Sequence, residues 1–307
     1  MVELSTDISN IKQLRQVNWS AYDALYLGDF SCPEYPNNFM SHPELLREGA
    51  ETVKAEGKKC YLRLYAVPSN HDLPWVKDVI EEAMTLPFDA LEVHNMGLLR
   101  LLREMGCTIP IHTGIFANLY THETAKILKN YGVERVYPNP ELSLKEIVYI
   151  QENADVETLV PVHGKIPLVI SETCFLVEFT EADPHDCKFL CSKDYWLKRG
   201  DWTLKDVGRM TLGGKDLCMI EHIDELLHMG LKNFYVQSRG ESPEYAGAVG
   251  KIYREALAKA ASGEKLDDAS PWLEELHSLA PIGLCNGYYF EGAGQKYVGR
   301  TPEWSPC

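Results

Sequence analysis

The sequence predicts an α/β protein of the TIM-like (β/α) barrel class, with parallel strands that alternate with helices. Short β-rich runs alternate with helical stretches along most of the chain, and Gly or Pro marks the turns between them. Seven such β/α units in succession favour a sheet that is closed or nearly closed into a barrel. An open, doubly wound sheet is the alternative, but no Gly-rich phosphate loop follows the first expected strand.

The expected elements follow one another in a regular order. The strands are expected at residues 23–28, 59–66, 89–95, 108–114, 133–139, 156–164 and 231–239. The helices are expected at residues 42–57, 73–85, 96–106, 121–132, 142–153 and 242–262. A polar insertion at residues 175–217 interrupts this order. We therefore expect a barrel domain at residues 1–262 and a loop-rich tail, packed on the barrel, at residues 263–307.

Charge and hydropathy narrow the classes of partner. Thirty basic against forty-five acidic residues give a net charge of −15, which repels phosphate backbones and anionic membranes. The N-terminus lacks a basic start followed by an apolar run, and no stretch approaches eighteen uninterrupted apolar residues. We expect a cytoplasmic protein without membrane insertion that acts on a small molecule, and the charge disfavours nucleic acid as a partner.

Cysteines carry the sharpest chemical signal. The chain has nine of them and no export signal, which favours metal binding or thiol chemistry over a disulfide framework. Cys174, Cys187 and Cys191 share one polar segment, with twelve residues and then three residues between them. Three thiolates this close in the chain can coordinate one centre, either zinc or iron and sulfur. The long first gap differs from the paired knuckles of structural zinc sites and favours iron and sulfur.

The fourth ligand must come from elsewhere in the chain. Cys32 ranks first because it follows a strand, and the carboxyl ends of barrel strands meet at one face. Cys218 ranks second, at the expected start of a helix. Cys60 and Cys107 lie beside strands, where burial is expected.

Strand ends also supply candidates for catalysis and binding. His94, His112 and His163 are potential acid/base groups or extra ligands, with a structural hydrogen bond as the alternative role. Arg239 lies between a strand and a helix that begins near Ser242, an arrangement suited to binding an anion. The alternative for Arg239 is a surface ion pair beside a capping turn. A serine or cysteine hydrolase has little support, because the G-x-S-x-G elbow is absent from the sequence.

Two segments together resemble a known family. "LYLGDFSC" and "HGKIPLVISETCFLVEFTEADPHDCKFLC" are similar to the collagenase-like U-32 peptidase family, and within it to the UbiV-like branch. Three further segments resemble blocks of the wider family, and the likeness extends from about residue 24 to residue 294. They are "IPIHTGIFANLYTHETAKILKNYGVERVYPNPELSLKEI", "KDLCMIEHIDELLHMGLKNFYVQSRGESPEYAGAVGKIYREAL" and "CNGYYFEG".

This resemblance implies a cofactor and a reaction. It implies a TIM-like barrel with a four-iron four-sulfur (4Fe-4S) cluster held by Cys32, Cys174, Cys187 and Cys191, with Cys218 as the alternative fourth ligand. Zinc is the alternative metal. The implied role is oxygen-independent hydroxylation of an aromatic or quinone precursor, as in ubiquinone biosynthesis, with prephenate as hydroxyl donor and a UbiU-like subunit as partner.

The resemblance also directs attention to the catalytic candidates, which are His112, Asn118, Glu141, His163 and Arg239. Three alternatives stay open: a collagenase-like peptidase, a factor that hydroxylates a tRNA or rRNA base, and a zinc-stabilised scaffold with no chemistry of its own. Leu159, Glu172 and Pro140 depart from the usual family residues at their positions. The substrate, and whether the chain is itself an enzyme, therefore stay undetermined at the level of sequence.

Overall fold

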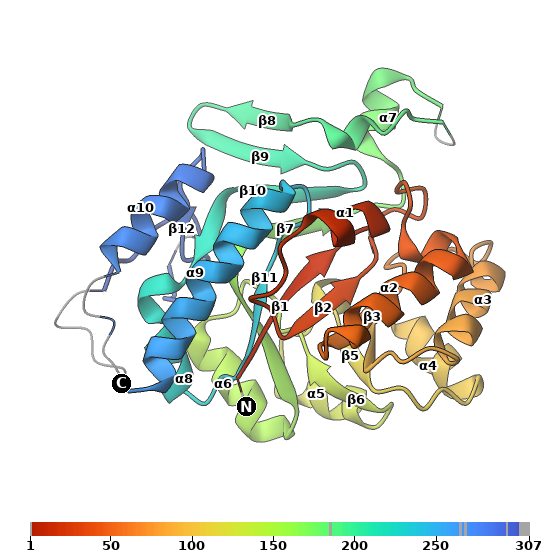
Figure 1. The fold of residues 1–307 in the computed structure, drawn as a ribbon, viewed down its shortest axis with the longest axis horizontal. Coiled ribbons are helices and arrows are strands. Elements are labelled where there is room, and N and C mark those ends of the chain that lie inside the picture. Colours follow the sequence, from red (N-terminus) through yellow and green to blue (C-terminus); the bar gives the residue numbers. More distant parts are fainter. Residues whose placement is uncertain (1, 184–185, 264–265, 267–268, 293, 301–307) are drawn as a thin grey trace.

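Eight parallel strands close into a barrel that helices surround (Figure 1). The computed structural model describes residues 2–183, 186–263, 266, 269–292 and 294–300. In order of pairing, the barrel strands are β11 (Asn233–Val236), β1 (Glu3–Ile8), β2 (Ala24–Leu27), β3 (Lys59–Arg63), β4 (Ala90–Val93), β5 (Ile111–Thr113), β6 (Val133–Val136) and β7 (Glu157–Ile170). Parallel pairing between β7 and β11 closes the ring, so the predicted TIM-like fold is confirmed.

Helices between the strands cover the outside of the barrel. They are α1 (Ile11–Gln16), α2 (Pro43–Ala55), α3 (Leu73–Ala83), α4 (Met96–Glu104), α5 (His122–Lys129), α6 (Leu144–Ala154), α8 (Ile223–His228) and α9 (Pro243–Ala261). Each turns an apolar stripe inward; in α4, for example, Leu98, Leu99 and Leu102 are buried. Ser143 and Glu146 form a capping box that sets the start of α6.

Short 3-10 turns complete these connections. They are η1 (Phe39–Ser41), η2 (Ile115–Ala117), η3 (Leu190–Ser192) and η4 (Ile220–His222). Among the residues described above, no helix combines the length and apolar character needed to cross a membrane.

Strand β1 is the eighth β/α unit, which the sequence analysis missed. Its polar residues Ser5, Thr6 and Asp7 hide the β pattern, yet all six residues of the strand are buried. The Ser5 Oγ donates to the Phe234 carbonyl at 3.0 Å, and the Thr6 Oγ1 donates to the Val236 carbonyl at 2.9 Å. These two hydroxyls find hydrogen-bond acceptors on the neighbouring strand, so a polar run can be buried inside a barrel.

The polar insertion folds as a helix and an antiparallel extension of the barrel sheet. Its elements are α7 (Phe175–Thr180), β8 (Tyr195–Arg199), β9 (Trp202–Asp206) and β10 (Met210–Cys218). Strand β7 continues beyond the barrel and pairs with β10, so α7, β8 and β9 lie together along the upper edge in Figure 1. Cys218 ends β10, so the expectation that Cys218 begins a helix was wrong; α8 begins at Ile223.

The C-terminal segment is more regular than the loop-rich tail expected at residues 263–307. It contains α10 (Ser270–Leu279) and β12 (Leu284–Cys285), and β12 pairs with β10. The Tyr289 hydroxyl donates to the Pro161 carbonyl at 2.7 Å, which ties this segment to β7. Residues 301–307 of the expected tail lie outside the described residues.

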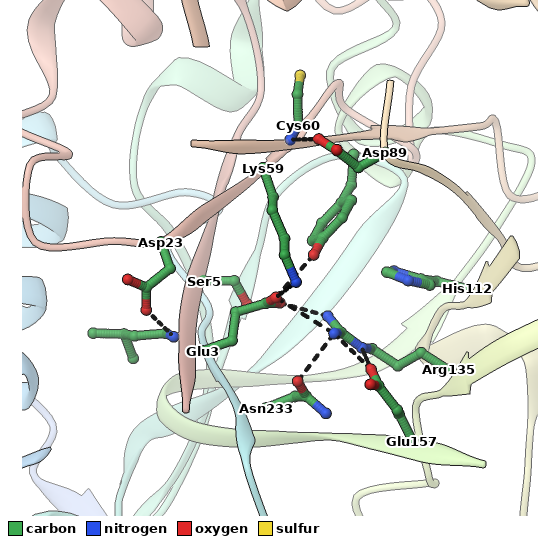
Figure 2. A network of polar contacts seen from close by, with 12 residues as sticks. Glu3, Ser5, Asp23, Lys59, Cys60, Asp89, His112, Arg135, Glu157 and Asn233 are labelled. Atoms are coloured by element: carbon green, nitrogen blue, oxygen red, sulfur yellow. Dashed lines mark hydrogen bonds and ion pairs between the residues drawn. The ribbon is translucent and has the colours of Figure 1, made fainter. Parts of the chain in front are cut away.

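A buried charge network holds the amino-terminal end of the barrel (Figure 2). The Arg135 guanidinium donates to Glu3 Oε1 at 2.5 Å, to Glu157 Oε2 at 2.7 Å and to Asn233 Oδ1 at 3.0 Å. Lys59 Nζ donates to Glu3 Oε2 at 2.8 Å. Burial alone raises the pKa of Glu3, but the charges of and hydrogen bonds from Arg135 and Lys59 outweigh it and lower this pKa. Five strands, β1, β3, β6, β7 and β11, are thereby joined across the barrel interior.

We predict that Arg135→Leu lowers the free energy of unfolding by about 3–5 kcal/mol, because it leaves the buried Glu3 carboxylate poorly paired. Urea unfolding at pH 7 measures this loss. The lowered pKa of Glu3 means that its contribution is present above the unfolded pKa of glutamate and disappears as the pH falls through the folded value. The matched control is Glu157→Gln, whose side chain is 58% exposed and should cost under about 1 kcal/mol. Equal losses in both variants would contradict the prediction.

Candidate functional site

All four cysteines ranked first by sequence line one cavity of about 170 Å³ at the carboxyl end of the barrel. Cys32 follows β2, and Cys174 immediately precedes α7. Cys187 and Cys191 lie between α7 and β8, in a segment whose residues 184–185 lie outside the described residues. The barrel and the insertion therefore each contribute thiols to the same space.

Gly208, in the turn between β9 and β10, forms one wall of this cavity. Its φ of +98° is a conformation that other residues rarely adopt. A Cβ placed there would lie 3.5 Å from the Cys174 Sγ and 3.4 Å from the Cys191 Cβ. The backbone conformation thus favours glycine, while a Cβ there would make only ordinary contacts with the thiols.

Cys218, the alternative fourth ligand, lies elsewhere. It is fully buried beside β7, where it pairs with His163, and it is not one of the described residues that line the cavity. The Tyr253 hydroxyl donates to its sulfur at 3.8 Å. Of the two residues considered for the fourth position, the structure brings only Cys32 to the other three.

The four thiols line one shared space. Within the described ranges, no three Cys, His, Asp or Glu side chains form a cluster arranged to hold a single metal ion. The cavity has room for several water molecules.

Burial and nearby charges set the protonation of the thiols. Burial raises the pKa of Cys32 to about 12; the Asp29 charge adds to this rise, and the Arg209 charge opposes it. Burial raises the pKa of Cys191 to about 11, and Arg239 opposes that rise. Both thiols are protonated at neutral pH without a metal, so metal binding must displace their protons.

Two arginines lie beside the cavity. Arg209 lines it and donates from Nη1 to the Tyr65 hydroxyl at 2.7 Å. Arg239, predicted to bind an anion or to form a surface ion pair, is instead buried and paired with the Asp29 carboxylate. Ser242 caps α9 by accepting from the Tyr245 N–H at 3.2 Å. Arg239 and Asp29 therefore form a buried ion pair beside the cavity.

The two predicted catalytic histidines lie away from this cavity. His163, on β7, is fully buried, and its Nδ1 lies 3.3 Å from the Tyr253 hydroxyl. Burial lowers the pKa of His163 to about 4; Asp216 opposes this shift, and Lys165 adds to it. His112 lies inside the barrel near Arg135 (Figure 2), and burial, with the Arg135 charge, holds its pKa well below the ordinary value. Both are neutral at pH 7.

Asn118 and Glu141 lie on loops after β5 and β6. Asn118 ends η2 with a φ of +57° and accepts from Asn139 Nδ2 at 3.2 Å. Glu141 is exposed and accepts from the Tyr120 hydroxyl at 2.7 Å. Neither residue lines the cysteine cavity, so the structure shows loop-stabilising contacts at both positions.

A second buried charged group lies at a small cavity, and the sequence predicted only its His94 as a site residue. Glu92 Oε1 lies 2.9 Å from Arg63 Nε and 2.9 Å from His94 Nε2. The Phe116 N–H donates to His94 Nδ1 at 3.3 Å, which leaves Nε2 to donate to Glu92. The adjoining cavity, of about 10 Å³, has room for one water molecule. The available signal was a charged residue within an apolar strand, at Arg63 in β3 and at Glu92 in β4.

Comparison with known proteins assigns the family. The model of "Peptidase family U32" matches residues 9–299. The chain belongs to peptidase family U32. The family expected from sequence is thereby confirmed, although the match does not distinguish its branches.

Three relatives illustrate the range of names in this family. The chain is 30% identical to "Uncharacterized protease MJ0090" of Methanocaldococcus jannaschii, over 97% of this chain and 75% of that protein. It is 27% identical to "tRNA hydroxylation protein P" of Haemophilus influenzae, over 96% and 75%. It is 25% identical to a "Collagenase" of Porphyromonas gingivalis, over 88% and 66%. Relatives of this U32 protein thus carry names of two unrelated activities.

The low pKa of His163 predicts a pH dependence of stability. As the pH falls below about 6.5, a histidine in the unfolded chain binds a proton while folded His163 does not, so folding loses stability down to about pH 4. Between pH 7 and pH 5 the wild type should therefore lose about 2 kcal/mol more unfolding free energy than His163→Gln. Urea unfolding at the two pH values measures this difference, with His71→Gln, at an exposed position, as the control. Parallel pH profiles of wild type and His163→Gln would refute it.

Proposed function

We propose that this U32 protein binds a 4Fe-4S cluster and takes part in oxygen-independent hydroxylation. The observation that carries the proposal is the convergence of Cys32, Cys174, Cys187 and Cys191 on one cavity. Cysteine thiolates are the ordinary ligands of such clusters. The names of several relatives, "tRNA hydroxylation protein P", support the reaction class.

The residues around the cavity suit an anionic cluster. The four cysteines would hold it, and the positive charges of Arg209 and Arg239 would offset part of the negative charge of four thiolates. A bound cluster would supply one-electron chemistry in a site that excludes bulk water in part. Zinc remains the alternative metal, and it would make the site a structural support without redox chemistry.

For the substrate, we propose an aromatic or quinone precursor, with prephenate as hydroxyl donor and a UbiU-like subunit as partner. The net charge of −15 supports a small molecule over a polyanion. Hydroxylation of a tRNA base is the second candidate, because relatives that match over more than nine-tenths of this chain carry that name.

Peptidase activity gains no support from the cysteine cavity. A nucleophilic cysteine needs a lowered pKa, which produces the reactive thiolate. Burial instead raises the pKa of Cys32 and that of Cys191. These thiols are better suited to ligating a metal than to attacking a peptide bond.

Metal analysis tests the proposal directly. Protein purified without oxygen should contain about four iron and four sulfide per chain and absorb visible light. Cys32→Ser should lose most of this iron because it removes a ligand, whereas Cys218→Ser should retain it because Cys218 lies outside the cavity. One zinc per chain without sulfide, or equal iron loss in both variants, would contradict the proposal.

Substrate assays separate the two hydroxylation candidates. Cells that lack this protein should accumulate an unhydroxylated quinone precursor under anaerobic growth and keep normal tRNA modification, both measured by mass spectrometry. Re-expression of the wild type should restore the quinone, and re-expression of Cys32→Ser should not. Loss of a hydroxylated tRNA base alone would favour the second candidate.

A further inference from the structure

We propose that Asp29 and Arg239 are positioning residues, a buried ion pair that joins the barrel loop carrying Cys32 to the insertion carrying Cys191 and sets the charge at the cluster. This inference rests on the proposed iron–sulfur function. The two residues are 1% and 4% exposed at their side chains. Neither belongs to the four cysteine ligands.

On the barrel side, the Asp29 carboxylate organises the turn that carries Cys32. Asp29 Oδ1 accepts from the Ser31 N–H at 2.9 Å, from the Ser31 hydroxyl at 2.6 Å and from the Cys32 N–H at 3.1 Å. Three donors on one oxygen hold the backbone of Cys32 relative to the end of β2. The other oxygen, Oδ2, stays available for Arg239.

On the insertion side, Arg239 contacts the segments that form the rest of the cavity wall. Its Nε forms an ion pair with Asp29 Oδ2, in a geometry that is not a well-aligned hydrogen bond. Its Nη2 donates to the Val207 carbonyl at 3.4 Å, next to Gly208. Its guanidinium lies 4.6 Å from the ring centre of Tyr35, which lines the cavity. Arg239 thus connects the loop at residues 29–35, which carries Cys32, with the turn at Val207 and Gly208.

Both charges of the ion pair lie next to the cysteine cavity. Asp29 lies beside the cysteines through its hydrogen bond from the Cys32 N–H, and Arg239 lies beside them through its contacts with Val207 and Tyr35, which line the cavity. Since both charges are buried, solvent screens them weakly. Neutralising Arg239 leaves the negative charge of Asp29 unpaired, and neutralising Asp29 leaves the positive charge of Arg239 unpaired. The electrostatic potential at the site therefore changes in opposite directions in the two variants.

This arrangement predicts opposite effects on the reduction potential. Reduction adds one negative charge to the cluster, so a nearby positive charge raises the potential and a nearby negative charge lowers it. Arg239→Gln should therefore shift the potential down, and Asp29→Asn should shift it up. The double variant Asp29→Asn/Arg239→Gln removes both charges and should return toward the wild-type value.

The experiment is a redox titration of the anaerobic holoprotein with dithionite and mediator dyes, followed by the visible spectrum of the cluster. The matched control pair is Asp23→Asn and Arg254→Gln, which breaks a partly exposed ion pair of 2.6 Å on the barrel and should leave the potential unchanged. Iron content and thermal melting of each variant report cluster loading and folding. If Arg239→Gln fails to load iron, Arg239→Lys is measured in its place. Arg239→Lys keeps the positive charge, so its reduction potential should stay near that of the wild type. Asp29→Asn should still shift the potential up.

Opposite shifts that cancel in the double variant support the inference. Shifts in the same direction, or none, in variants that hold a full cluster would overturn it and would leave the proposed function intact. A wild-type protein without iron would instead refute the proposed function.

Discussion

The closure of the barrel by β1 is the constraint on which the site depends. Strand β1 pairs with β2 on one side and with β11 on the other. The loops that follow β2 and β11 carry Asp29 and Arg239, which lie far apart in the chain but meet at the carboxyl end of the closed ring. Without β1 the two edges of the sheet would separate, and the loops that carry Asp29 and Arg239 would move apart. Ser5 and Thr6 add side-chain hydrogen bonds to β11 at this seam.

The two ends of the barrel use buried charge for different purposes. At the amino-terminal end, Arg135 and Glu3 belong to a network in which each charge has an opposite partner within hydrogen-bonding distance. At the carboxyl end, charged residues adjoin cavities, and the cavity of about 170 Å³ is lined by thiols. This division matches the general behaviour of β/α barrels, in which one face serves stability and the other carries the chemistry.

The cysteine cavity is shared between the barrel and its insertion. Cys32 belongs to a β/α loop of the barrel, whereas Cys174, Cys187 and Cys191 belong to the segment that leads from β7 into the antiparallel extension. The long pairing of β7 with β10 directs that segment back over the barrel mouth. A ligand set split in this way forms only when both parts fold together, which links binding at the cavity to the stability of the whole chain.

The sequence by itself determined the local features of this protein. Alternating apolar runs predicted seven of the eight barrel strands, and amphipathic periods predicted six of the helices, α2 to α6 and α9. The spacing of three cysteines predicted their common site. Only the tertiary structure decided which residues meet. Strand β1 escaped detection because its polar side chains bond to a strand far away in the chain, and Cys32 rather than Cys218 reached the cavity because of where β2 and β10 end. The Asp29 and Arg239 pair was invisible for the same physical reason: periodicity encodes neighbours along the chain, whereas contacts between loops are set by the closure of the sheet.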